Sequence, residues 1–241
     1  MLRQIVKDYS VVTTLTPSGV VPQGTSSAAK GVIAYILEDN AAEASILDIG
    51  FGTGGLGELI KSDARTRHWS VDGVDGFEAN CANPILLKSG IYRNIWHGLA
   101  QEIPLETLAQ YKIICLLDVI EHLPAEAAKL LLETLLRNMG QDSFLFISIP
   151  LWFYPQDMMQ SGDLEAHLIG VPVTSMTALK PKIYCVSEPF IGTFVLTKGS
   201  LDFIDAFQPT TDPRFSMERG MELADLIEFR YDTNIIFRTG W

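Results

Sequence analysis

The stretch ILDIGFGTGG, residues 46–55, decides the fold of this 241-residue chain. Its first half is apolar except for Asp48, which is typical of a strand buried in a sheet. Its second half is rich in glycine, which reaches positive φ at little cost and lets a ligand approach the backbone. The stretch therefore predicts a strand, a tight ligand-binding turn and a following helix. The glycines are Gly50, Gly52, Gly54 and Gly55.

Strands and helices alternate outward from this turn. This order predicts an α/β fold with a doubly wound, mostly parallel sheet covered by helices on both faces. Two further strands within residues 181–199 are joined by a turn and are expected to pair antiparallel. The other expected strands are residues 46–50, 68–75, 92–98, 111–118 and 143–150, and the expected helices start at Gly55, run through 77–90 with a break near Pro84, and span 124–140.

Composition excludes several kinds of partner. The formal net charge is −11, and no basic cluster is longer than Arg65-Thr66-Arg67, so the chain is not expected to bind nucleic acid. The longest apolar tract, residues 144–155, is too short to span a bilayer. The start of the chain shows no secretory signal, and a cytoplasmic location is expected.

The acids beside the glycines indicate which ligand the turn prefers. The glycines satisfy G-x-G-x-x-G, the pattern of dinucleotide-binding loops, but they fit other nucleotides equally well. Asp48 would repel a pyrophosphate, since two like charges 4 Å apart cost about 4 kcal/mol at an effective dielectric of about 20. It would attract a ligand that carries an ammonium and a sulfonium. Asp75, at the end of the second strand, can accept hydrogen bonds from ribose hydroxyls.

Four motifs in order, ILDIGFGTG, VDGVDGF, IWHGLAQEIP and YKIICLLDVIEHLP, resemble the class I S-adenosylmethionine-dependent methyltransferases. The last motif is similar to the ubiquinone-biosynthesis-type branch and its small-molecule relatives. The resemblance covers about residues 45–150 and implies a Rossmann-like, seven-stranded sheet closed by the antiparallel pair in 181–199. It also implies S-adenosyl-L-methionine as cofactor.

The resemblance implies a set of cofactor contacts by position. Asp48 would orient the methionine end, and Asp75 would hold the ribose. Many relatives have an aspartate where this chain has Leu99, so adenine is expected against backbone and apolar groups. The implied contact residues are Asp48, Gly50, Phe51, Gly52, Thr53, Gly54, Asp75, Gly76, Phe77, Leu99, Ala100, Asp118 and Val119.

The chain is predicted to form one domain, residues 1–241. Residues 1–25 are expected to be irregular or partly helical because Pro and Gly interrupt them, and Ser26 or Ser27 would cap a helix ending near Asn40. The expected parts are an N-terminal arm and helix (1–45), the cofactor-binding core (46–150), a substrate lid (151–180), and a C-terminal hairpin and tail (181–241).

The segment DVIEHL follows the fourth expected strand and leaves three interpretations open. Glu121 and His122 could cap the next helix and shape the pocket wall. His122 or His167, the latter in GDLEAH, could accept a proton as general base, since the pKa of histidine is about 6.5. Third, Asp118, Glu121, His122 and His167 could hold a divalent ion. The spacing resembles the E-x-x-E-H-H metal site of small-RNA 2′-O-methyltransferases, with Asp118 and Leu123 as departures, so no metal is predicted outright.

Two further patterns bear on the acceptor. No N/D-P-P-Y-like tetrad follows the fourth strand, where Asp118-Val119-Ile120-Glu121 stands, and this favours a hydroxyl oxygen or a small-molecule nitrogen over a nucleobase amine. A lid could exclude water from the reaction. The candidates for it are Trp152, Phe153, Tyr154, Met158 and Met159.

The sequence thus predicts a methyltransferase that acts on a small molecule by in-line transfer in a desolvated pocket. The alternatives are a catalytically silent nucleotide-binding or scaffold protein on the same fold and, less well supported, an NAD-dependent oxidoreductase. The acceptor and the oligomeric state do not follow from the sequence.

Overall fold

The computed structural model describes residues 9–13, 44–153, 156–158, 164–187, 191–212 and 235–239, with backbone only for 9–13, 185–187 and 235–239. The helix predicted between Ser26 and Asn40 lies outside these residues, as do Tyr154 and Met159. No helix within the described ranges combines the length and the apolar character that a bilayer crossing needs.

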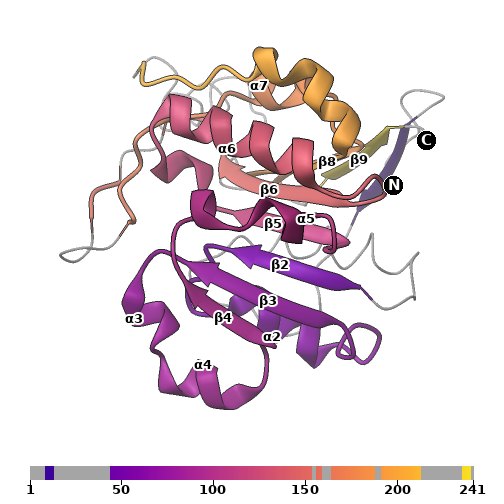
Figure 1. The fold of residues 1–241 in the computed structure, drawn as a ribbon. Coiled ribbons are helices and arrows are strands. Elements are labelled where there is room, and N and C mark those ends of the chain that lie inside the picture. Colours follow the sequence, from indigo (N-terminus) through magenta and orange to yellow (C-terminus); the bar gives the residue numbers. More distant parts are fainter. Residues whose placement is uncertain are drawn as a thin grey trace.

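One mixed sheet organises the molecule, with strand order β1-β9-β7-β8-β6-β5-β2-β3-β4 (Figure 1). The strands from β4 to β6 run parallel, and β8, β7, β9 and β1 join antiparallel. The bounds are β1 Tyr9–Thr13, β2 Ser45–Ile49, β3 Ser70–Asp75, β4 Asn94–His97, β5 Ile113–Leu117, β6 Phe144–Pro150, β7 Ile183–Ser187, β8 Ile191–Leu196 and β9 Ile235–Thr239.

The seven strands from β2 to β8 are those that the sequence predicted, including the antiparallel pair β7–β8. Two further strands, β9 and β1, extend this sheet beyond β7. The expectation of an irregular or helical arm over residues 1–25 is wrong at Tyr9–Thr13, which pairs antiparallel with Ile235–Thr239. The β-branched residues of YSVVT suit a strand, but the partner strand β9 lies near the other end of the chain. No local sequence pattern therefore predicts the pairing.

The order of the parallel strands reverses beside β2. From β2 the chain moves outward through β3 to β4, and it then returns to place β5 on the other side of β2. In open α/β sheets the crevice at such a switch point, beyond the carboxyl ends of the strands, is where ligands bind. The residues that follow β2 and β5 therefore face one site.

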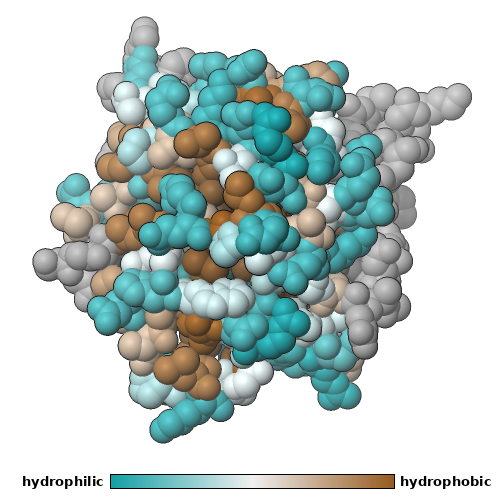
Figure 2. All heavy atoms as spheres, viewed as in Figure 1, coloured by the Kyte–Doolittle hydropathy of each residue, from teal (hydrophilic) through white to brown (hydrophobic). Residues whose placement is uncertain are grey.

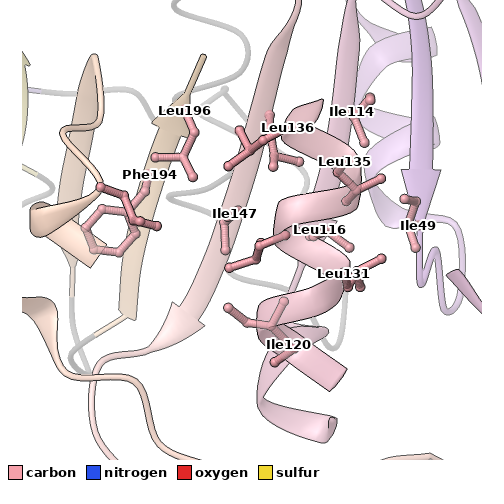
Figure 3. Close-up of a cluster of buried hydrophobic side chains, with 14 of the residues drawn as sticks. Ile49, Ile114, Leu116, Ile120, Leu131, Leu135, Leu136, Ile147, Phe194 and Leu196 are labelled. Atoms are coloured by element: carbon pink, nitrogen blue, oxygen red, sulfur yellow. The ribbon is translucent and has the colours of Figure 1, made fainter. Parts of the chain in front are cut away.

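Helices cover both faces of the sheet, as predicted. On one face α6 (Ala125–Asn138) packs Leu131, Leu135 and Leu136 against buried residues of β2, β5 and β6 and toward Phe194 and Leu196 of β8 (Figure 3). α5 (Leu105–Leu108), α7 (Val173–Ala178) and η3 (Lys198–Ala206) join this face. On the other face, α2 (Gly55–Ser62) and α4 (Pro84–Ser89) bury Leu56, Ile60 and Leu86.

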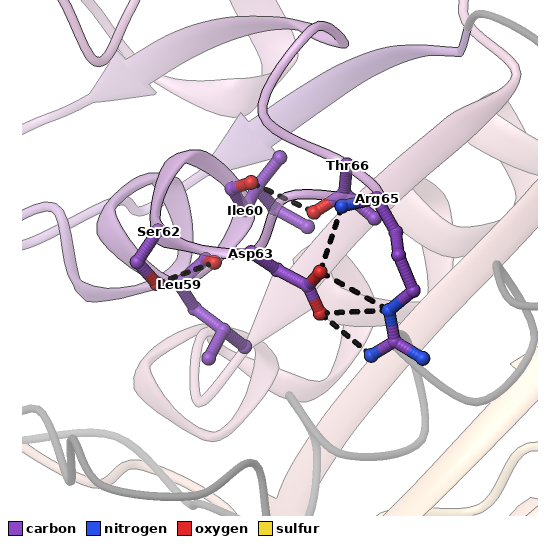
Figure 4. Close-up of polar contacts among 6 residues, drawn as sticks. All are labelled: Leu59, Ile60, Ser62, Asp63, Arg65 and Thr66. Atoms are coloured by element: carbon purple, nitrogen blue, oxygen red, sulfur yellow. Dashed lines mark hydrogen bonds and ion pairs between the residues drawn. The ribbon is translucent and has the colours of Figure 1, made fainter.

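The turn after α2 is closed by its own polar groups (Figure 4). The Thr66 hydroxyl donates to the Ile60 carbonyl at 2.7 Å, and the Ser62 hydroxyl donates to the Leu59 carbonyl at 2.9 Å. Asp63 accepts from the backbone and the guanidinium of Arg65. The Thr66 bond satisfies the Ile60 carbonyl at the end of the helix, and the chain then continues into β3.

Short elements complete the carboxyl edge of the sheet: α3 (Glu78–Cys81), η1 (Ala100–Glu102) and η2 (Ile120–His122). On the surface in Figure 2, hydrophobic residues gather at the centre of the face and at its lower end, where α4 lies in Figure 1. Ile85 and Leu87 of α4 are the exposed apolar residues of that helix.

Candidate active site

The glycine loop lies directly beyond β2. Gly50, Gly52 and Gly54 have φ values of +73°, +56° and +89°, in the left-handed region that favours glycine. A Cβ at Gly52 would meet nothing within 4 Å, so the space beside this part of the loop is open. The loop thus offers bare backbone to an open space at the switch point.

The carboxylate of Asp75 holds this loop from the end of β3. Its Oδ2 accepts from the Gly52 N–H at 2.8 Å and from the Asn80 side-chain amide at 3.2 Å, and its Oδ1 accepts from the Phe77 N–H at 2.8 Å. Asp75 is 6% exposed. An ionised carboxylate offers about four acceptor positions, so these three bonds leave it capacity for one more donor, such as a ribose hydroxyl.

Asp48 lies beneath the loop rather than in the crevice. It is 2% exposed, and its Oδ2 accepts from the Tyr92 hydroxyl at 2.7 Å. Burial, followed by the Asp48 charge, raises the pKa of Tyr92 well above its usual value, so the tyrosine stays a donor. The expectation that Asp48 faces the ligand is wrong in its geometry, because period-two alternation along β2 turns its side chain to the same face as Ile46, which packs in the cluster with α2.

Phe51 was predicted as a contact residue of the loop, and a contact through its backbone stays a prediction. Its side chain does not reach the crevice: it is 3% exposed and lies in the core, with its ring 5.2 Å from that of Tyr92. Asp48, Tyr92 and Phe51 therefore form a support under the loop. The sequence signal for Tyr92 was only its place at the start of the third expected strand.

The segment after β5 touches the glycine loop. A Cβ at Gly50 would lie 2.6 Å from Cγ2 of Val119, so these two loops pack closely enough that only glycine fits. Asp118, before Val119, has a φ of +57°, which is rare outside glycine and is found at functional sites. Its Oδ1 accepts from the Ser148 hydroxyl at 2.9 Å. Ser148, polar within the apolar strand β6, is a residue that the sequence could have flagged.

Glu121 is buried without a side-chain partner. It is 2% exposed, and neither carboxylate oxygen has a hydrogen-bond partner among the described residues. Burial, with the nearby charges of Asp118 and Glu165, raises the pKa of Glu121 well above its usual range. Buried polar groups in proteins are almost always hydrogen-bonded, so this carboxyl group calls for an explanation.

His122 and His167 adjoin Glu121, although 45 positions separate them in the sequence. Their ring centroids are 4.8 Å apart, and both residues are half-buried. Ligand atoms of Glu121, His122 and His167 all lie within 4.8 Å of one another. Asp118, which was the fourth member of the possible metal set, is not in this group and bonds Ser148 instead.

Backbone hydrogen bonds fix this arrangement. The Glu121 carbonyl accepts from the N–H groups of Leu168 and Ile169, at 2.8 and 3.2 Å. His122 Nδ1 lies 3.2 Å from the Ala166 carbonyl, which suits an N–H donor at that nitrogen. The segment that carries His167 is therefore bound to the segment that carries Glu121 and His122.

An apolar surface borders the loop on the side of β3. A Cβ at Gly76 would lie 2.6 Å from Cδ1 of Leu164 and 3.0 Å from Cδ2 of Leu99. Leu164 and Leu99 are 51% and 48% exposed. The segment from Leu164 onward thus reaches the carboxyl edge of the sheet, within the range 151–180 in which the sequence placed a lid.

The remaining predicted contact residues lie along the same edge. Thr53 is exposed in the loop, while Phe77 and Ala100 are half-buried beyond β3 and β4. Of the lid candidates, Trp152 packs against the core, Phe153 is half-buried and Met158 is 61% exposed.

Comparison with known proteins identifies the family. A family model described as a methyltransferase domain matches residues 25–180, about two thirds of the chain. The chain belongs to the methyltransferase-domain family. The class I fold that the sequence resemblance predicted is confirmed by this match together with the seven predicted strands of the sheet.

Solved structures are similar to this methyltransferase domain at low identity. The N-terminal domain of EvdMO1, crystallised with SAH and D-fucose, is 13% identical, with 75% of this chain and 90% of that chain covered and a TM-score of 0.50. The CMeT domain of the citrinin polyketide synthase is 13% identical, with 70% and 51% covered and a TM-score of 0.52. Magnesium protoporphyrin IX methyltransferase from Synechocystis PCC 6803 with bound SAH is 17% identical, with 76% and 91% covered and a TM-score of 0.47.

The methyltransferase domain spans about half the length of several of the solved proteins that it matches. No curated protein matches it by sequence.

Proposed function

We propose that this chain is an S-adenosylmethionine-dependent methyltransferase that methylates a small molecule at a hydroxyl oxygen. The observation that carries the proposal is the Asp75 carboxylate bound to the Gly52 N–H at the switch point of a methyltransferase-domain sheet. When bound, S-adenosylmethionine supplies an electrophilic methyl group on a sulfonium. The residues of this chain hold the cofactor and the acceptor.

The residues present fit this cofactor. The open space beside Gly52 gives room for a ligand at the backbone, and Asp75 keeps capacity for a hydroxyl donor. The exposed Leu99 and Leu164 offer the apolar surface that an adenine ring requires. Asp48 is expected to act through Tyr92, holding the loop in shape, and not through a direct contact.

The acceptor is expected at the Glu121–His122–His167 cluster. Val119 packs on Gly50 and lies two residues before Glu121. The cluster therefore adjoins the wall of the cofactor crevice. Half-buried imidazoles beside a buried carboxyl group can hold a hydroxyl and accept or direct its proton. The absence of an N/D-P-P-Y-like tetrad at residues 118–121 supports oxygen over a nucleobase nitrogen.

The first experiment measures cofactor binding and its dependence on Asp75. Calorimetric titration is expected to detect binding of S-adenosylhomocysteine, the demethylated cofactor, at micromolar levels and none of NADH. Asp75→Ala should weaken this binding by about 10–100-fold, since a hydrogen bond to a charged group contributes about 1.5–3 kcal/mol. Glu78→Gln, an exposed acid three residues away, is the matched control and should bind as the wild type does.

Turnover separates the proposal from its alternatives. Incubation with S-adenosylmethionine and a library of hydroxylated and amine-bearing small molecules, followed by mass spectrometry, should reveal products heavier by one methylene on oxygen. Cofactor binding without any product would favour the catalytically silent scaffold. Binding of NADH in place of S-adenosylhomocysteine would overturn the proposal in favour of an oxidoreductase.

A further inference from the structure

We propose that Glu121, His122 and His167 form a binding site for one divalent transition-metal ion of the Zn²⁺ class, beside the glycine loop. The binding part of this inference stands on the geometry alone, and its catalytic consequence rests on the proposed function.

The unpartnered carboxylate is the first argument. Glu121 is 2% exposed, yet neither of its carboxylate oxygens has a hydrogen-bond partner in the described part of the chain. A buried carboxylate without a partner is costly, and metal coordination is one of the few ways in which proteins satisfy such a group. The imidazoles of His122 and His167 lie beside it and can supply nitrogen ligands.

The distances are the second argument. The three ligand atoms lie within 4.8 Å of one another. Ligands bonded to one zinc ion at about 2.0–2.2 Å in tetrahedral geometry lie about 3.4 Å apart. We expect metal binding to draw the three side chains together by rotations about their χ angles.

The orientation of His122 is the third argument. Its Nδ1 lies 3.2 Å from the Ala166 carbonyl, so the proton belongs on that nitrogen and Nε2 is the nitrogen left for a metal. Metal-ligating histidines commonly donate their other ring N–H to a backbone carbonyl, which fixes the tautomer. Here the carbonyl belongs to the residue before His167, so the same short segment supplies one ligand and orients another.

The donor set selects the kind of ion. Two imidazoles and one carboxylate are the His₂Glu set of catalytic zinc sites, which keep a fourth position open for water or substrate. Mg²⁺ and Ca²⁺ prefer oxygen ligands throughout, so they are expected to bind weakly. We expect the open position to lie on the side of the two half-buried histidines, away from the buried Glu121.

The consequence for the proposed reaction is acceptor activation. A bound ion lowers the pKa of an oxygen that it coordinates, so the acceptor hydroxyl would lose its proton to water on binding. The new O–C bond would then form as the C–S bond of the donor breaks, and the products are the methyl ether and S-adenosylhomocysteine. No oxidant or reductant is needed.

The test titrates the chelator-treated full chain with Co²⁺, which reports on its ligands by visible absorption. We expect one ion per chain, displacement by Zn²⁺ and no displacement by Mg²⁺. Glu121→Gln and His167→Gln should each weaken binding by more than about 100-fold, beyond the 10–100-fold typical of groups that only orient a ligand. His68→Gln, an exposed histidine outside the cluster, is the matched control and should bind as the wild type does.

Two outcomes overturn the proposal. One is the absence of a Co²⁺ or Zn²⁺ site in the wild type, and the other is equal binding by the wild type and both cluster variants. Thermal unfolding of the same proteins checks that the variants are folded, and Zn²⁺ should raise the melting temperature of the wild type and of His68→Gln only. Titration with S-adenosylhomocysteine is measured separately, so that loss of the metal site and loss of the cofactor site are told apart.

Discussion

Two carboxylates in this molecule are almost equally buried and have opposite surroundings. Asp72, in the first half of β3, is 1% exposed and accepts hydrogen bonds from Arg93, Tyr111 and Asn94 at 2.5–3.0 Å. Glu121, beyond the carboxyl end of β5, is 2% exposed, and its oxygens have no partner among the described residues.

We propose that the difference separates a structural acid from a functional one. Every oxygen of Asp72 is used to join β3 to β4 and to the segment before β5, so nothing is left for a ligand. Burial of the Glu121 carboxyl group is unfavourable, and no described side chain compensates for it by a hydrogen bond. Glu121 lies at the edge of the sheet where α/β proteins bind ligands. Perturbed and unsatisfied groups of this kind mark functional sites.

The largest change in stability is expected from removing the structural acid, Asp72. Asp72→Ala should lower the free energy of unfolding by about 2–3 kcal/mol, because the buried Tyr111 hydroxyl and the Asn94 amide lose an acceptor that is charged. Arg93 adds little to this loss, since its side chain is 53% exposed and stays solvated. Urea unfolding measures the change, and binding of S-adenosylhomocysteine should be unaltered.

The pH dependence provides the control for this variant. Burial alone would raise the pKa of Asp72, but the hydrogen bonds from Arg93, Tyr111 and Asn94 outweigh it and hold the pKa below its usual 3.8. A lowered folded-state pKa gives stability that is present above about pH 4 and is lost as pH falls through the folded-state pKa. The gap in urea midpoint between the wild type and Asp72→Asn should therefore shrink below pH 4. A gap that stays constant would contradict an ionised Asp72.

A smaller change in stability is expected from Gly50→Ala in the glycine loop. The left-handed conformation costs a residue with a Cβ about 1–2 kcal/mol, and the new methyl would lie 2.6 Å from Val119. We expect a loss in the free energy of unfolding of about this size, together with weaker binding of S-adenosylhomocysteine, because the loop must shift.

Val119→Ala tests whether that contact is the cause. The double variant Gly50→Ala, Val119→Ala removes the clash but keeps the left-handed backbone, so it should recover part of the lost cofactor affinity. Additive effects of the two substitutions, measured by a double-mutant cycle, would show that the loop and the segment after β5 are not coupled.

The smallest change in stability is expected from Glu121→Gln, which is matched to Asp72→Asn. In the metal-free protein, Glu121→Gln should leave the free energy of unfolding unchanged or raise it by up to about 1 kcal/mol, since an unpartnered buried carboxyl group is replaced by a neutral group of the same shape. Asp72→Asn changes it in the opposite direction at neutral pH. Urea unfolding in the presence of a chelator measures both, and a large loss for Glu121→Gln would mean that Glu121 has a structural role.

Much of the fold could be read from local patterns. The strands from β2 to β8, the glycine loop and α6 follow from apolar runs, glycine positions and the Pro124 and Gly140 boundaries, each of which lies within one short segment. The strand ends then place Asp75 and the residues after Leu117 at one edge. The direction of each side chain was less accessible: Asp48 and Phe51 stand beside the loop in sequence, but they point to the face that Tyr92 occupies.

By itself, the sequence determined the strands from β2 to β8 and the helix α6, because those choices depend on neighbours within a few positions. Only the tertiary structure decided the pairs that join distant segments: Tyr9–Thr13 with Ile235–Thr239, and His167 with Glu121 and His122. Such pairs depend on the closure of long stretches of chain and on backbone hydrogen bonds such as those from Leu168 and Ile169 to Glu121. The sequence pattern within one segment does not predict these long-range pairs, because the partner that makes each contact favourable lies in another segment.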